Sequence, residues 1–194
     1  MGNRVKAYKL FVCLIVFVVI TFLWISDSLS GSTVKERIVV APHPVLRQKA
    51  ALIDRQDHEA IQLLIEMADY LDDSVRPIAG ISLPQVAVSK RGFIVMIDEE
   101  AVIMINPQIT KLGQDVPSLE GCLSLPGQYG YVNRNSSILV EYHDEDWEKQ
   151  TLRLEQLYAF AVQHEHDHLD GILITDKMLA DVPVSTRNSD IPLE

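Results

Sequence analysis

A helical repeat near the C-terminal end constrains the fold more than any other part of the sequence. Within residues 154–170, spacings of three and four separate Leu154, Leu157, Ala161, His164 and His168. Such spacing places the side chains in one column of an α-helix, and Gly171 directly after the run predicts its end. Because the column is apolar at its start and carries two imidazoles further on, we expect this helix to pack in the interior of the domain.

The two histidines of this helix belong to a short chemical motif. His164, Glu165 and His168 form the sequence H-E-x-x-H. On a helix the two imidazoles lie one turn apart on the same face and can bind one metal ion. Glu165 lies beside them and can take a proton from a water molecule that the ion activates. The motif occurs by chance in many chains, but buried histidines and a buried carboxylate need partners, which favours a metal site here.

A hydrolytic metal site needs a third protein ligand and one open position. Extension to H-E-x-x-H-x-x-G-x-x-H fails because Ile174 stands where the third histidine would be. Glutamate is also hard to supply, since Glu194 is the only one after Glu165. Thiolate is the remaining strong ligand, and Cys122 lies in a turn-rich segment at 120–127. The alternative interpretation of Cys122 is a small buried apolar residue.

A second helix is predicted upstream of this chemistry. Residues 58–72 have the periodicity of an amphipathic helix, with Asp54 or Asp57 available as its N-cap. The face expected to be buried contains Ile61, Leu64, Ile65, Ala68 and Leu71.

Alternating and β-branched runs predict strands over 92–98, 101–105 and 137–143, with a hairpin turn at 98–100. The strands precede the long helix and do not alternate with helices, which is typical of an α+β fold. We expect small antiparallel or mixed β-sheets packed around a central helix that carries H-E-x-x-H.

The amino terminus differs from the rest of the chain. Residues 10–25 are apolar except for Thr21, and the basic residues Arg4, Lys6 and Lys9 precede them. The run is longer than many signal-peptide cores and shorter than a full membrane span, so a cleaved signal and a signal anchor both stay open. We expect residues 1–33 to form a hydrophobic targeting or anchor segment with a linker, and residues 34–194 to form one catalytic domain.

Charge and composition exclude other classes of protein. The chain has 17 Lys and Arg against 27 Asp and Glu, a formal net charge of −10. No basic cluster follows the first ten residues, so direct nucleic-acid binding is not expected. Two cysteines at unrelated positions do not form a disulfide framework.

At these motifs the sequence resembles the peptide deformylase family. EGCLSLPG at 120–127 and QHEHDHLDG at 163–171 look like its two metal-site signatures, and GISLPQ at 80–85 resembles its third motif. IVVAPHPVLRQKA at 38–50 is similar to the family's opening segment. The resemblance covers residues 38–178 and omits the apolar run.

The resemblance implies an enzyme that removes the N-formyl group from the N-terminal methionine of newly synthesised proteins and releases formate. Cys122, His164 and His168 would hold one divalent ion, usually Fe²⁺ in this family, with Zn²⁺, Ni²⁺ and Co²⁺ as alternatives. Glu165 would be the general base. The oxyanion would be stabilised by the Gln85 side chain and the Leu123 backbone N–H, and the substrate would be bound by Gly80, Gly121, Phe160 and Ala161.

The third motif departs from the family pattern. Ser82 and Leu83 stand where two alanines are usual, and Ile78 replaces a usual glycine. Leu83 adds bulk that we expect close to the site, where it would affect the substrate preference more than metal binding.

Two other functions stay open from the sequence. A membrane-tethered metallopeptidase would suit the run at 10–25, but its third ligand would normally be His or Glu, and Cys122 argues against it. A non-catalytic deformylase-like binding protein would have lost a ligand or Glu165, and both are present.

The expected partners are N-formylmethionyl nascent peptides near the ribosome, and a membrane through residues 10–25. We expect membrane anchoring by that segment or import into an organelle that translates with formyl-methionine, with the cytoplasm as the alternative.

Overall fold

The computed structural model describes residues 33–72 and 78–179. The chain divides into two compact units, 1–36 and 37–194, with the short helix α2 (Val34–Arg37) at the boundary. The apolar run at 10–25 lies outside the described residues. No helix within the described ranges is long and apolar enough to cross a membrane.

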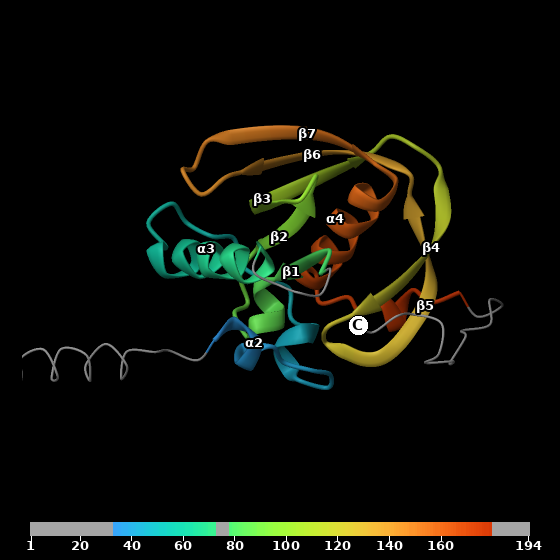
Figure 1. Cartoon of the computed structure of the whole chain (residues 1–194), viewed down its shortest axis with the longest axis horizontal. Coiled ribbons are helices and arrows are strands. Elements are labelled where there is room, and N and C mark those ends of the chain that lie inside the picture. The colour runs from blue at the N-terminus through green and yellow to red at the C-terminus, as the bar shows by residue number, and fades with distance from the viewer. Residues whose placement is uncertain (1–32, 73–77, 180–194) are drawn as a thin grey trace, which may run out of the picture. The chain divides into compact units, whose positions relative to one another are not determined.

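Two antiparallel sheets form the frame of the second unit (Figure 1). The larger has the order β1-β2-β3-β6-β7, with the strands Gly80–Ser82, Gly92–Ile97, Glu100–Lys111, Ser137–His143 and Lys149–Glu155. The smaller pairs β4 (Asp115–Cys122) with β5 (Leu125–Asn135). Three 3-10 helices connect these elements: η1 (Pro44–Arg47), η2 (Leu83–Val86) and η3 (Ile174–Asp176).

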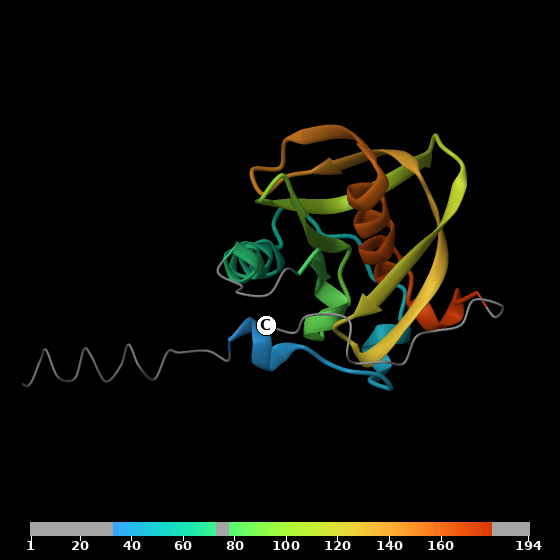
Figure 2. The same cartoon turned by 45° about the vertical axis from the view of Figure 1, so that its right-hand side comes forward.

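Helix α4 (Gln156–Leu169) carries H-E-x-x-H and contacts strands of both sheets (Figure 2). β1, β2, β6 and β7 of the larger sheet and β5 of the smaller sheet all pack against it. The predicted α+β architecture around a central helix is confirmed.

The predicted start of α4 is wrong. Leu154 belongs to β7, which pairs with β6 throughout its length, and the helix begins only at Gln156. Leu157, predicted to face inward, is 77% exposed. The buried residues of α4 are Ala159, Phe160, Val162, Gln163, His164, Glu165, His168 and Leu169. They do not form one narrow column, because neighbouring elements surround the helix on more than one side.

Helix α3 (His58–Asp72) has the predicted bounds but a rotated buried face. The face consists of Ala60, Leu63, Leu64, Met67, Ala68 and Leu71. Ile61 and Ile65 are only partly buried. Asp57 is the N-cap, since its Oδ1 accepts a hydrogen bond from Ala60 N at 3.3 Å.

Strands β2 and β6 agree with the prediction, and Asp98 and Glu99 form the expected turn, with φ of 51° and 69°. β3 extends well beyond its predicted end, to Lys111. The sequence did not predict β4 or β5, because Pro and Gly interrupt both. Pro117 is tolerated in β4 because that strand pairs on one side only, with β5.

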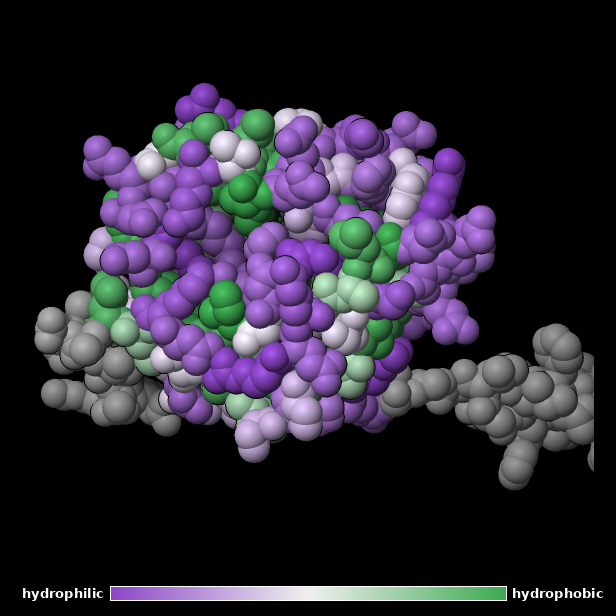
Figure 3. Space-filling view, turned by 180° about the vertical axis from the view of Figure 1, so that it is seen from behind, coloured by the Kyte–Doolittle hydropathy of each residue, from purple (hydrophilic) through white to green (hydrophobic). Residues whose placement is uncertain are grey.

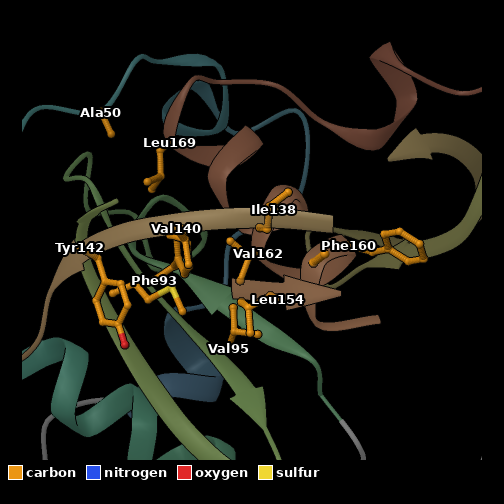
Figure 4. Close-up of a cluster of buried hydrophobic side chains, with 12 residues drawn as sticks. Ala50, Phe93, Val95, Ile138, Val140, Tyr142, Leu154, Phe160, Val162 and Leu169 are labelled. Carbon is orange, nitrogen blue, oxygen red and sulfur yellow. The ribbon is translucent and has the colours of Figure 1, made fainter. Parts of the chain in front are cut away.

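A buried hydrophobic cluster packs α4 onto the larger sheet. Figure 4 shows Phe93, Val140 and Val162 among its members. A second cluster joins η1, β5 and η3 through Val45, Leu46, Leu125, Val132, Leu173 and Ile174, with Cys122 packed against it. The face seen in Figure 3 is mostly hydrophilic, with hydrophobic residues scattered over it. The two clusters fix the positions of α4 and of the end of β4.

The assignment of buried and exposed sides of α4 can be tested by two matched substitutions. Leu169→Ala removes a fully buried side chain and should lower the free energy of unfolding by about 2–5 kcal/mol. Leu157→Ala, on the exposed side, should change it by less than about 0.5 kcal/mol. Urea denaturation of both variants measures the free energy of unfolding. An equal decrease in the two variants would contradict the assignment of Leu169 to the buried side and Leu157 to the exposed side.

Candidate metal centre

α4 and the end of β4 bring a thiol and two imidazoles together. The ligand atoms of Cys122, His164 and His168 all lie within 4.8 Å of one another. Cys122 Sγ is 3.3 Å from His168 Nε2. No other group of three or more His, Cys, Asp or Glu with this spacing occurs among residues 33–72 and 78–179. One thiolate and two imidazoles suit a first-row divalent ion, so the donor set fits the expected metal.

An irregularity in the β4–β5 pair directs Cys122 toward α4. Gly121 still pairs with Tyr129, but Cys122 pairs with Leu125, so the register shifts between the two. Such shifts re-aim side chains at the ends of strands. Glycine at 121 leaves room for the Tyr129 ring, which would lie 2.6 Å from a Cβ atom there and would have to shift.

Glu165 is buried beside the ligands, with 4% of its surface exposed. Its close approach depends on Gly80, where a Cβ atom would lie 2.9 Å from Glu165 Cγ. Burial raises the pKa of Glu165 to about 7, against the opposing charge of His164. Glu165 Oε2 has no hydrogen-bond partner in the described part of the chain. A carboxyl with these properties can exchange a proton near neutral pH.

Gln85 reaches the site from η2 and is 1% exposed. Its Oε1 accepts hydrogen bonds from the Ser82 backbone N and from Ser82 Oγ, both at 2.9 Å. Its Nε2 lies 3.6 Å from Cys122 Sγ. The amide nitrogen of Gln85 therefore faces the cluster of ligands.

The sequence did not predict the partner of His164. His164 Nδ1 lies 2.9 Å from Glu120 Oε2, and Arg134 donates from Nε and Nη2 to the two Glu120 oxygens, both at 2.9 Å. Burial would raise the pKa of Glu120, but the hydrogen bonds from Arg134 and His164 outweigh it and lower the pKa to about 2. An ionised Glu120 holds the proton on Nδ1 and leaves Nε2 free to bind a metal.

Asp167 extends this network away from the ligands, since its carboxylate binds Arg134 and Lys177. The sequence signals for the network were a glutamate two residues before Cys122 and a single arginine in an otherwise uncharged strand. Neither signal gives the distance to His164.

His168 is the more deeply buried of the two candidate imidazole ligands, with 1% of its surface exposed. Burial lowers the pKa of His168 well below its usual value, so the ring is neutral, as a metal ligand must be. Its Nδ1 has no hydrogen-bond partner among the residues that the structure describes.

The other predicted site residues differ in their burial and in the elements to which they belong. Leu123 follows Cys122 in the turn between β4 and β5 and is partly buried. Phe160 belongs to the buried cluster under the larger sheet, whereas Ala161 is only partly buried. Gly80 is buried and Gly121 is exposed.

Leu83, expected to add bulk close to the site, has its side chain in the core, and its effect on substrate preference stays a prediction. Its side chain is fully buried. A Cβ atom on Gly92 would lie 3.1 Å from Leu83 Cδ1, close to atoms of Leu64 and Ile53 as well. Leu83 therefore lies in the core near α3, where the absence of a side chain at Gly92 leaves room for it.

Known proteins are similar to this chain in both sequence and fold. Residues 35–182 match the family model described as Polypeptide deformylase. A peptide deformylase of Agrobacterium fabrum is 36% identical over 145 residues, which cover 72% of this chain and 84% of that relative. One from Picosynechococcus is 37% identical over 149 residues, covering 74% of this chain and 79% of the relative.

The crystal structure of a peptide deformylase from Thermotoga maritima has a TM-score of 0.66 and 32% identity, over 73% of this chain and 96% of that chain. Another from Legionella pneumophila has a TM-score of 0.67 and 30% identity, over 74% and 85% of the two chains. Since the match extends over the domain that holds Cys122 and the helix with H-E-x-x-H, this chain belongs to the peptide deformylase family, metal-dependent hydrolases that remove the N-formyl group from nascent peptides.

Proposed function

We propose that this chain hydrolyses the formyl amide of N-formylmethionyl nascent peptides with one divalent ion held by Cys122, His164 and His168. The observation that carries the proposal is the convergence of their ligand atoms within 4.8 Å, with the buried Glu165 beside them. When bound, the ion polarises the formyl carbonyl and makes water more acidic. We propose Fe²⁺ as the resident ion, with Zn²⁺, Ni²⁺ and Co²⁺ as ions that the same donor set accepts.

Glu165 is the proposed general base and acid. Its carboxylate takes one proton from the water molecule whose oxygen attacks the formyl carbon. It then gives that proton to the methionine nitrogen as the carbon–nitrogen bond breaks. The products are a free N-terminal amine and formic acid, which loses its remaining acidic proton to solvent and leaves as formate, and Glu165 is regenerated as the carboxylate. The unpartnered Oε2 supports this role.

Gln85 and Leu123 are the proposed donors to the formyl oxygen as it gains negative charge. The orientation of Gln85 Nε2 toward Cys122 Sγ, at 3.6 Å, supports its part. The Leu123 backbone N–H follows the ligand Cys122 directly in the turn. Donors preorganised in this way contribute about 3–4 kcal/mol each to stabilising the transition state.

The substrate-binding residues are proposed from their places around the centre. The backbones of Gly80 and Gly121 would line the peptide channel, and Phe160 and Ala161, one turn before His164, would border the methionine pocket. The two alternative functions find less support. A thiolate third ligand disfavours the metallopeptidase, and the presence of Glu165 disfavours a non-catalytic binding protein.

The proposed location is a reducing compartment that contains ribosomes, because the substrate emerges there and an oxidising one would threaten the Cys122 thiolate. Residues 10–25 would anchor the enzyme to a membrane facing that compartment or direct its import into a translating organelle.

Substitution of Glu165 tests the mechanism. Glu165→Gln keeps the size of the side chain but cannot exchange the proton, so kcat for formate release from formyl-Met-Ala-Ser should fall by about 10²–10⁴-fold. The bound metal, measured by elemental analysis of anaerobically purified protein, should stay at the wild-type level. Wild-type turnover by this variant would rule out Glu165 as the base.

Substitution of Glu120 tests how His164 is held. Glu120→Gln replaces the ionised acceptor of His164 Nδ1 by a neutral one, and metal affinity should fall by about tenfold or more. Competition with a chelator of known affinity measures the change. Glu148→Gln, on an exposed side chain outside the site, is the matched control and should leave the affinity unchanged. Equal affinities in the two variants would contradict the role of Glu120.

Cell fractionation tests the proposed location. Protease treatment of intact membranes or organelles, with and without detergent, shows on which side the domain lies. We expect the domain to lie in the same compartment as the ribosomes that use formyl-methionine. Recovery of the intact domain from a secreted fraction would refute this location.

A further inference from the structure

Ser82 holds the side chain of Gln85 through two hydrogen bonds to one atom. Gln85 Oε1 lies 2.9 Å from the Ser82 backbone N and 2.9 Å from Ser82 Oγ. Ser82 is fully buried and Gln85 is 1% exposed. The backbone bond is the reciprocal half of a capping box, in which the third residue of a helix reaches back to the N-cap. The hydroxyl bond is additional.

The two donors determine which way the amide of Gln85 points. A backbone N–H can only donate, so the atom that faces it must be the amide oxygen. The amide nitrogen then lies on the opposite side, where Nε2 is 3.6 Å from Cys122 Sγ. The bond from the Ser82 backbone therefore sets the direction of the amide.

The Ser82 hydroxyl adds a second constraint. A carbonyl oxygen has two lone pairs, and the terminal torsion of glutamine is broad when only one of them is used. With both lone pairs of Gln85 Oε1 occupied, the amide plane cannot turn without breaking a buried hydrogen bond. The N–H groups of Gln85 are then aimed in a fixed direction before substrate arrives, which is the preorganisation that an oxyanion donor needs.

We propose that Ser82 is a positioning residue of the deformylation reaction, whose hydroxyl fixes the Gln85 carboxamide with its N–H groups toward the formyl oxygen. The inference rests on the proposed role of Gln85 as an oxyanion donor. Alanine, which the family motif usually has at this position, would keep the backbone bond and lose the hydroxyl bond. The second constraint therefore comes from this chain's own serine.

A competing role for the hydroxyl involves Glu165. Burial raises the pKa of Glu165, and a hydrogen bond with Ser82 lowers it by a smaller amount. Glu165 is therefore a second acceptor to be considered for the Ser82 hydroxyl. A serine hydroxyl has one proton and donates to one acceptor at a time. An experiment must therefore separate action through Gln85 from action through Glu165.

The first measurement is the kinetics of Ser82→Ala with formyl-Met-Ala-Ser. We expect kcat to fall about 5–20-fold, with KM changed less than twofold, because the lost alignment affects the charged transition state more than substrate binding. Ser137→Ala is the matched control. Ser137 is also buried, and its hydroxyl has no partner in the part of the chain that the structure covers. Equal kcat values for Ser82→Ala and wild type would overturn the proposal.

A double-mutant cycle identifies the residue through which Ser82 acts. Gln85→Met removes the amide at similar length, and Ser82→Ala in that background should change kcat less than twofold, since no amide is left to position. If Ser82→Ala still reduces kcat 5–20-fold in the Gln85→Met protein, the hydroxyl acts on Glu165 or elsewhere, and the proposal is wrong.

A measurement without turnover completes the test. In nitrogen-15 NMR spectra of the metal-free protein, Ser82→Ala should shift the side-chain NH₂ signals of Gln85 and speed their exchange with water, while Ser137→Ala leaves both unchanged. Unshifted Gln85 signals would refute the positioning role. Wild-type protein that releases no formate would refute the proposed function instead, and the NMR result would still report whether Ser82 holds Gln85.

Discussion

The burial of four polar side chains on α4 is the constraint on which the site depends. Helix α4 is packed between two sheets, and its inward positions include Gln163, His164, Glu165 and His168. Buried polar groups need partners, so each surrounding element must supply them. β5 supplies Asn135, whose backbone N–H donates to Gln163 Oε1 and whose carbonyl accepts from Gln163 Nε2. β4 supplies Glu120 to His164.

Two atoms of this set keep no partner within the described residues, Glu165 Oε2 and His168 Nδ1. The protein thus holds the helix through hydrogen bonds at Gln163 and at His164 Nδ1 and leaves Glu165 Oε2 without a partner among the described residues. Gly80 makes this arrangement possible, because any side chain there would collide with Glu165. A carboxylate that is buried but not committed to a hydrogen bond at Oε2 is free to exchange a proton with a substrate or a water molecule.

The sequence predicted the parts of the fold and site that depend on local spacing. The bounds of α3 and the grouping of His164 with His168 follow from the helical period. Eliminating other ligands made Cys122 a candidate, and the family resemblance assigned it to the metal. β7 could not be predicted, because its charged sequence becomes a strand through pairing with β6. The same limit applies to Glu120, whose contact with His164 joins residues that are 44 positions apart. Such contacts depend on tertiary distances that no local pattern contains.

Ser82 and Leu83, the two neighbouring departures from the third motif of the family, lie in different surroundings in the fold. Ser82 ends β1, and Leu83 begins η2. The Ser82 hydroxyl contacts Gln85 at the site, whereas Leu83 lies in the core, where its Cδ1 and that of Leu64 are both close to Gly92. The larger change in volume therefore falls in the core, where Gly92 provides the space. The smaller change, one hydroxyl, falls on a residue that binds Gln85, whose Nε2 lies 3.6 Å from Cys122 Sγ. The chemical effect of a substitution in this motif depends on what the side chain contacts more than on its size.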